Sequence, residues 1–104
     1  MCINTGGEKV FPEEVEEALK LHPAVEDCTV VGIPDEKWGE RIVAVVAFGS
    51  GLSASESDLI ASTRQRLAAY KSPKQVVVVE RIVRSPAGKA DYRWARETAI
   101  RVVS

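Results

Sequence analysis

The sequence predicts an α+β domain, in which a small mixed sheet of about three main strands is flanked by three helices. Two observations carry this prediction. The hydrophobic patterns follow one another as helix, strand, strand, helix, strand and helix, an order typical of helices packed on a sheet. The chain has 104 residues, of which 45% are hydrophobic, and this length supports one compact core but not two. We therefore treat residues 1–104 as one domain.

The first half of the chain predicts one helix and two strands. A helix is expected over residues 12–21, because Pro12 suits the first helical position and the following acidic residues suit the positive end of the helix dipole. His22-Pro23 ends this helix. Residues 25–33 are rich in β-branched side chains and predict a strand. Residues 41–48 contain the run IVAVVAF, which is typical of a strand buried on both faces, and residues 34–40 predict a loop.

The second half predicts a helix, a short strand and a final helix. After a turn at residues 49–53, either Ser53 or Ser55 can cap a helix that runs to about residue 69, since each is followed three residues later by an acidic side chain. Pro73 breaks the chain before a strand at residues 76–79. A polar stretch, residues 80–90, leads to a last helix that Asp91 can cap. The side chains expected to face the core from this helix are Ala95, Thr98, Ala99 and Val102.

Composition excludes several classes of protein. The formal net charge is −1, so a phosphate would have to be held by a local cluster of Lys and Arg, and no nucleic-acid partner is expected. No apolar run reaches the roughly 18 residues that a transmembrane helix needs, and MCINTGGEK does not resemble a signal peptide. Cys2 and Cys28 have neither CxxC nor metal-ligand spacing. We expect reduced thiols, no metal ligands in this chain and a cytoplasmic protein.

Two turn segments contain residues without an obvious place in the core. Gly6 and Gly7 precede the first helix, and paired glycines permit positive φ and a close approach of another molecule to the backbone. The same pair also suits a plain tight turn. Trp38 lies in the charged loop between the first two strands. It can cover the edge of the core or offer an aromatic face to a nucleobase.

The third segment is RSPAGKAD, in which Lys89 follows Gly88 in a loop before the last helix. Such a lysine can present a compact positive charge to a phosphate. The segment is not a P-loop, because that motif requires Gly where Val83 stands and Ser or Thr where Ala90 stands. A solvated loop lysine is the alternative. The residues alone leave the function open between a binding module and part of an enzyme.

These segments together resemble the C-terminal domain of the adenylate-forming superfamily, which includes acyl-CoA synthetases, peptide-synthetase adenylation domains and luciferases. INTGGEKVFPEEVEEAL is similar to the motif at the start of that domain, LAAYKSPK to a second motif, and RSPAGKADYR to the terminal Gly-Lys motif. PDEKWGE is similar to a loop that carries an aromatic residue in CoA ligases. The resemblance extends from about residue 3 to residue 96.

The resemblance implies two sets of site residues. Lys89, preceded by Gly88, would be the lysine of the adenylation step, in which a carboxylate attacks the α-phosphate of ATP. In a second orientation of the domain, Gly6 and Gly7 would flank the tunnel for the pantetheine of CoA. The residues expected to meet the rest of CoA are Trp38 and Tyr70, through their rings, and Lys71 and Lys74, through its phosphates. Some relatives carry Arg where Ser72 stands, so a phosphate contact at that position is not expected.

The resemblance also implies substrates and partners. We expect ATP, CoA and Mg²⁺, a carboxylic acid of the long-chain or steroid-side-chain type, and a larger N-terminal domain that holds the acid pocket and the Mg²⁺ ligands. The chain is expected to begin just after the hinge and to be inactive alone. Two alternatives stay open: an adenylation domain that acts on a carrier-protein thiol, and a free-standing α+β binding module.

Overall fold

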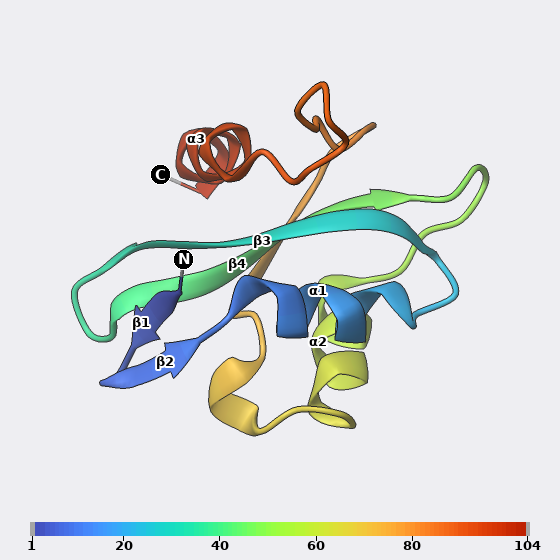
Figure 1. The fold of residues 1–104 in the computed structure, drawn as a ribbon. Helices are drawn as coiled ribbons and strands as arrows, with labels where there is room; N and C mark the ends of the chain where they lie inside the picture. The colour runs from blue at the N-terminus through green and yellow to red at the C-terminus, as the bar shows by residue number, and fades with distance from the viewer. Residues whose placement is uncertain (1, 104) are drawn as a thin grey trace.

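The computed structural model describes residues 2–103 and has three layers, with a sheet between two groups of helices (Figure 1). On one face lie α1, α2 and the short 3₁₀ helix η1, and on the other lies α3. The elements in chain order are β1 (Ile3–Thr5), β2 (Glu8–Val10), α1 (Pro12–Lys20), β3 (Val25–Asp35), β4 (Gly39–Phe48), α2 (Glu56–Arg64), η1 (Ala69–Lys71), β5 (Gln75–Val78) and α3 (Tyr92–Val103). The predicted α+β class and the three helices are confirmed.

Strand β4 is the centre of the sheet. It pairs antiparallel with β3 along a long hairpin that runs from Val25 opposite Phe48 to Asp35 opposite Gly39. On its other side it pairs in parallel with β5, which follows the α2 crossover, and it meets β1 where Thr5 lies opposite Gly39. Because one pairing is parallel and the others are antiparallel, the sheet is mixed, as predicted. The short hairpin of β1 and β2 extends the sheet beyond the three main strands.

The sheet has a hydrophobic core on each face, and β4 contributes to both. Ile42, Ala44 and Val46 pack with residues of α1 and α2. Val43, Val45 and Ala47 pack with residues of α3. Successive side chains of a strand point to opposite faces, so a strand covered on both faces is apolar throughout. The prediction that the run IVAVVAF forms a strand buried on both faces is therefore confirmed.

The helix starts follow the capping residues seen in the sequence. The Ser55 hydroxyl accepts a hydrogen bond from the Asp58 N–H at 3.1 Å, so Ser55, not Ser53, caps α2. The Asp91 carboxylate accepts one from the Trp94 N–H at 2.9 Å at the start of α3. Pro12 occupies the first turn of α1. The Ser55 and Asp91 caps each satisfy an N–H group that has no partner within its own helix.

Two predictions about the helices are wrong. Helix α2 ends at Arg64 instead of near residue 69, and the N–H of Arg66 bonds to the Thr63 carbonyl at 3.0 Å, three residues back, as in a tightened last turn. Val102 does not face the core and is 58% exposed. The buried stripe of α3 continues from Ala99 to Val103, four residues on, and so leaves Val102 outside.

The loop expected at residues 34–40 is shorter in the structure. β3 extends to Asp35 and β4 begins at Gly39, so only residues 36–38 lie outside the strands. This tight connection places Trp38 directly at the end of the hairpin.

Among the described residues, no helix is long and apolar enough to span a membrane.

Candidate functional site

The paired glycines form the turn between β1 and β2. Both have positive φ, 59° at Gly6 and 84° at Gly7, as a two-residue hairpin turn of this hand requires. The Gly6 N–H donates to the Trp38 carbonyl at 2.8 Å. A Cβ atom at Gly6 would lie 3.0 Å from the Trp38 ring. Gly6 therefore permits both the turn and the close packing of the indole ring against the backbone, whereas Gly7 is exposed to open space.

Trp38 is held by the turn between β3 and β4. One carboxylate oxygen of Asp35 accepts hydrogen bonds from the N–H groups of Lys37, at 2.8 Å, and Trp38, at 2.9 Å. The hydrogen bond from Trp38 is the main reason that the pKa of Asp35 lies below its ordinary value. The carboxylate thus stays ionised and orders the turn. The indole ring is left 38% exposed at the edge of the sheet.

Trp38 and Gly6 line a pocket of about 190 Å³. Its wall combines two aromatic rings, two positive side chains and one carboxylate. The lining residues are Thr5, Gly6, Glu8, Trp38, Arg64, Ala69, Tyr70 and Lys74. Four of the residues that the sequence singled out, far apart along the chain, therefore meet at one place.

Positive charge is concentrated around the aromatic rings of this pocket. The ammonium groups of Lys37 and Lys74 lie 5.0 Å and 5.3 Å from the centre of the Trp38 ring, distances at which a cation and an aromatic face attract each other. Arg64, at the end of α2, adds a guanidinium group to the wall. Aromatic faces beside mobile cations suit a planar base that carries phosphates.

Lys71 and Ser72 are engaged elsewhere. The Lys71 ammonium lies 2.7 Å from a Glu14 carboxylate oxygen on α1, and this hydrogen bond raises the pKa of Lys71. Ser72 is buried, and its hydroxyl lies 2.6 Å from that of Thr63. Lys71 is thus paired with α1 and is not part of the pocket wall, and Ser72 ties η1 to α2.

Lys89 lies in a separate turn on the α3 side of the sheet. The Ser85 N–H donates to the Lys89 carbonyl at 2.9 Å, the Gly88 N–H to the Ser85 carbonyl at 2.8 Å, and the Lys89 N–H to the Ser85 hydroxyl at 3.2 Å. Gly88 has a φ of 80°, which favours glycine there. These three hydrogen bonds order the backbone of the turn, while the Lys89 side chain is exposed to solvent.

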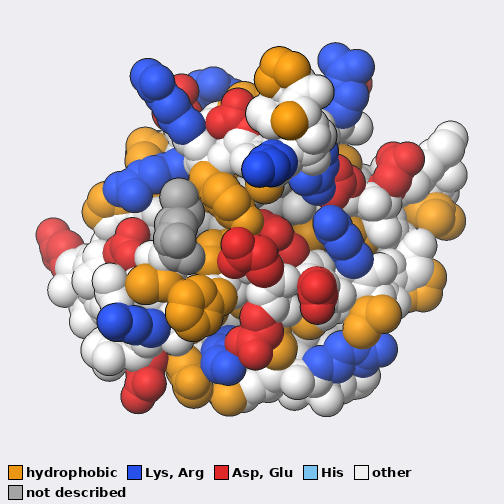
Figure 2. Space-filling view, viewed as in Figure 1, with side chains coloured by type: hydrophobic (Ala, Val, Ile, Leu, Met, Phe, Trp, Pro, Cys, Tyr) orange, Lys and Arg blue, Asp and Glu red, His pale blue; other side chains and the backbone are white. Residues whose placement is uncertain are grey.

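The pocket and the Lys89 turn lie on different sides of the molecule. In Figure 1 the turn, in orange, stands above the sheet next to α3, whereas η1 lies below the sheet with α1, and the hairpin of β1 and β2 forms part of the sheet itself. Figure 2 shows that Lys, Arg, Asp and Glu are interspersed over the face in view, without a field of one sign. Local clusters, and not the net charge, therefore define the candidate sites.

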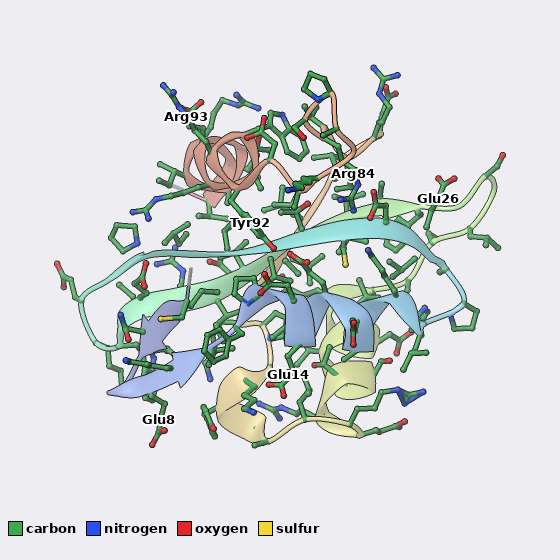
Figure 3. The ribbon with its side chains drawn as sticks, in the orientation of Figure 1. Glu8, Glu14, Glu26, Arg84, Tyr92 and Arg93 are labelled. Atoms are coloured by element: carbon green, nitrogen blue, oxygen red, sulfur yellow. The ribbon has the colours of Figure 1, made fainter. Side chains whose placement is uncertain are left out.

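A buried carboxylate links the two helical layers across the free edge of β3. Glu16 of α1 accepts a hydrogen bond from the Val30 N–H at 2.9 Å and one from the Tyr92 hydroxyl of α3 at 3.4 Å. Figure 3 shows the Tyr92 side chain reaching across this edge. Burial raises the pKa of Glu16 and that of the neighbouring Cys28 thiol to about 12. This cluster protects a strand edge and holds its thiol protonated, so it serves the fold.

Mg²⁺ has no candidate site in the described part of the chain. No group of three or more His, Cys, Asp or Glu side chains comes together there to hold a metal ion. No chemical step on this chain is assigned to Mg²⁺.

The structure adds two residues that the sequence analysis did not single out. Arg64 is a charge on a helix surface in the sequence, and the packing of α2 beside η1 and the β1–β2 hairpin makes it part of the pocket wall. Arg84 belongs to the RSPAGK segment, but its partner lies 57 residues earlier, at Asp27. A local pattern holds no signal for either contact.

Comparison with known proteins identifies the family. Residues 14–89 match the AMP-binding enzyme C-terminal domain. The chain belongs to this family. Matches to curated relatives cover nearly the whole AMP-binding C-terminal domain. The medium-chain acyl-CoA ligase Mig of Mycobacterium avium is 55% identical over 100 residues, which are 96% of this chain and 18% of that protein. The 3-oxocholest-4-en-26-oate–CoA ligase of Rhodococcus rhodochrous is 57% identical over 97 residues, 93% of this chain and 18% of that protein.

Solved structures agree with this assignment. A fatty acyl-CoA synthetase of Mycobacterium tuberculosis superposes with a TM-score of 0.89 at 39% identity, over 99% of this chain and 20% of that one. The AMP-binding C-terminal domain described here therefore spans about a fifth of the length of the proteins that it resembles. The resemblance seen in the four sequence motifs is confirmed at the level of the family and of the fold.

Proposed function

We propose that this chain is the mobile C-terminal domain of an ATP-dependent acyl-CoA ligase and that it serves the two half-reactions with two different surfaces. The observation that carries the proposal is the pocket of Gly6, Trp38, Tyr70 and Lys74, which lies away from the Lys89 turn. Two sites on different sides of one small domain cannot both face the same reaction centre at once. A rotation of the domain between the two steps resolves this.

In the first half-reaction Lys89 faces the reaction centre. A carboxylate oxygen attacks the α-phosphorus of ATP, the bond to the β-phosphate oxygen breaks, and acyl-adenylate and pyrophosphate form. The attacking group is already ionised at neutral pH, so no general base is needed. The Lys89 ammonium stabilises the approach of two anions by contacting the carboxylate and the α-phosphate. Its exposure in the free domain fits a group that acts only when docked.

In the second half-reaction the pocket faces the reaction centre. The thiol of CoA releases its proton to solvent, its sulfur attacks the acyl carbonyl, and AMP leaves with the electrons of the broken carbon–oxygen bond. Gly7 faces open space and gives the pantetheine arm a path without a side chain, while Gly6 lets the Trp38 ring pack closely along that path. Trp38 and Tyr70 offer rings to the rest of CoA, while Lys74 and Arg64 offer charges to its phosphates. Lys71 helps to place η1 through its ion pair with Glu14. If that pair opens, the Lys71 ammonium becomes a further cation for the phosphates of CoA.

The remaining machinery belongs to a larger N-terminal domain in this proposal. That domain would bind the acid, most of ATP and Mg²⁺. Relatives at least 52% identical are named as ligases for medium- or long-chain fatty acids and for 3-oxocholest-4-en-26-oate, which supports an acid of the long-chain or steroid-side-chain type. Both described cysteines are free, which supports a cytoplasmic enzyme.

The pocket is tested by changing Lys74 to Ala in the full-length ligase, with Lys9→Ala as the matched control on the neighbouring hairpin. Lys9 is exposed and does not line the pocket. Loss of one charged contact of about 1.5 kcal/mol predicts a rise of about tenfold in the KM for CoA in Lys74→Ala, with an unchanged rate of adenylation. Equal KM values for CoA in the two variants would contradict the proposal that CoA binds in this pocket.

A second assay distinguishes CoA from a carrier-protein thiol as the acceptor. We compare CoA with a phosphopantetheinylated carrier protein as the thiol substrate of the full-length protein. A preference for CoA supports the ligase. A preference for the carrier protein would assign the domain to an adenylation enzyme of the peptide-synthetase type.

A further inference from the structure

Arg84 forms a two-point ion pair with Asp27 at the root of the Lys89 turn. Its Nε lies 2.9 Å from Oδ2 of Asp27, and its Nη2 lies 2.6 Å from Oδ1. Arg84 precedes the turn, and Asp27 lies near the start of β3, on the edge of the sheet. Figure 3 shows Arg84 between the turn and β3. A planar guanidinium bound through two nitrogens fixes orientation as well as distance.

The same guanidinium reaches the turn itself. Nη1 of Arg84 lies 3.4 Å from the carbonyl oxygen of Gly88, the residue before Lys89. The backbone of Arg84 also forms an antiparallel bridge with Ala90, the residue after Lys89. Arg84 therefore contacts the chain on both sides of Lys89 and joins it to the sheet.

The ion pair is well supported by its surroundings. Both side chains are mostly covered, with 30% of Arg84 and 26% of Asp27 exposed. Asp27 also accepts a hydrogen bond from the Cys28 N–H at 2.9 Å and lies 3.5 Å from the Lys20 ammonium. Burial alone would raise the pKa of Asp27, but the hydrogen bonds from Arg84 and Cys28 outweigh it and lower the pKa. The anchor is therefore charged at neutral pH.

We infer that Arg84 is a positioning residue that sets the place of Lys89 through its contacts with Asp27 and the Gly88 carbonyl. The inference rests on the proposed role of Lys89 in adenylation. Three of the five N–H donors of the guanidinium are already used inside the domain. Arg84 thus acts through the turn and not as a ligand of the phosphates.

The test measures both half-reactions of the full-length ligase in Arg84→Gln, which keeps a long polar side chain but loses the charge and the fork. Misplacement of a catalytic group by about 1 Å can lower a rate by about 100-fold. We expect the kcat of adenylation to fall about 10- to 100-fold, with thioester formation from supplied acyl-adenylate within about twofold of wild type. Arg84→Lys keeps the positive charge but not the two-nitrogen fork, so its kcat of adenylation should lie between those of wild type and Arg84→Gln. Arg81→Gln, a nearby exposed arginine, is the control and should leave both rates unchanged.

A double-mutant comparison separates positioning from direct contact. If Arg84 acts through Lys89, Arg84→Gln should lower adenylation less than about twofold in a Lys89→Ala background, because effects of residues that act as a unit do not add. The inference would be overturned if the losses of adenylation rate in the two single variants multiplied in the double variant. An unchanged adenylation rate in Arg84→Gln, or equal losses in both half-reactions, would overturn it as well. Normal adenylation in Lys89→Ala alone would refute the proposed function itself, and it is recognised without any Arg84 variant.

Discussion

Thr29 is a buried residue whose polar atom has no partner in the described structure. It is fully buried in β3, and its hydroxyl oxygen lacks a hydrogen bond among residues 2–103. Because an unsatisfied buried hydroxyl costs about 1–3 kcal/mol, Thr29→Val should leave the fold unchanged and raise the free energy of unfolding by about 1 kcal/mol. Urea denaturation measures this change.

Thr63→Val is the matched control for this prediction. The Thr63 hydroxyl is bonded to the Ile60 carbonyl at 2.7 Å and lies 2.6 Å from the Ser72 hydroxyl. The same substitution there should lower the free energy of unfolding by about 1–2 kcal/mol. Destabilisation of similar size in both variants would mean that Thr29 has a hydrogen-bond partner in solution.

Two acidic residues give the stability opposite dependences on pH. The folded pKa of Asp27 is lowered, so its contribution is present above the unfolded value of about 3.9 and is lost as the pH falls through the folded value. The folded pKa of Glu16 is raised by burial, so its contribution is present below the unfolded value of about 4.3 and is lost as the pH rises through the folded value. Denaturation between pH 3 and pH 8 should show a weaker acid loss in Asp27→Asn and a weaker loss toward neutral pH in Glu16→Gln. Unchanged profiles would contradict these assignments.

The hairpin of β1 and β2 depends on a glycine in another strand. A Cβ atom at Gly32 of β3 would lie 2.7 Å from the Ile3 side chain and 3.0 Å from a Glu40 carboxylate oxygen. Glu40 also accepts a hydrogen bond from the Asn4 N–H at 2.9 Å. Gly32→Ala should therefore displace β1 and cost about 1–3 kcal/mol of unfolding free energy, as measured by chemical denaturation.

The cause of that loss is tested by adding Ile3→Ala. If the clash with Ile3 dominates, Gly32→Ala should cost clearly less in the Ile3→Ala background than in wild type. An equal cost in the two backgrounds would place the strain elsewhere.

The sequence predicts those elements whose local signals agree with their surroundings. The run of residues 42–48 is apolar on both faces because β4 is covered on both, and Ser55 and Asp91 act as caps within their own first turns. The end of α2 at Arg64 could not be predicted, since no glycine or proline stands between Arg64 and Pro73 to mark it. Val102 follows a helical stripe in sequence, but the packing of α3 selects Val103 instead.

The candidate site shows the same limit. Gly6 and Trp38 stand out by residue type and turn position, Tyr70 and Lys74 by resemblance to family motifs, and the fold brings all four to one pocket. Arg64 joins them only through tertiary structure. Lys71 was selected with the same group, but its pairing with Glu14 comes from the packing of η1 near α1. Motifs thus indicate which segments matter, while the contacts between segments decide which side chains meet.

At the scale of the whole molecule, the sheet separates two surfaces that would serve successive reactions. The Lys89 turn belongs to the α3 side and the pocket to the end where β1, β4 and η1 meet (Figure 1). The pocket beside Trp38 has a volume of about 190 Å³, which is below the roughly 300–1,000 Å³ of sites that enclose a small molecule, so it cannot hold an acyl chain and a nucleotide together. Residues 1–104 alone should therefore form no acyl-CoA from acid, ATP and CoA. Turnover by the isolated chain, measured as AMP release, would contradict the division of labour proposed here.

The most direct test of the two-surface account is the ratio of the two half-reaction rates in the full-length Lys89→Ala variant. Adenylation is measured by pyrophosphate exchange, and thioester formation is measured from supplied acyl-adenylate and CoA. The account predicts that adenylation falls by about 100- to 1,000-fold, as for loss of one electrostatic contact in a transition state, while thioester formation stays within about threefold of wild type. Equal loss of both half-reactions, or retention of adenylation, would contradict it.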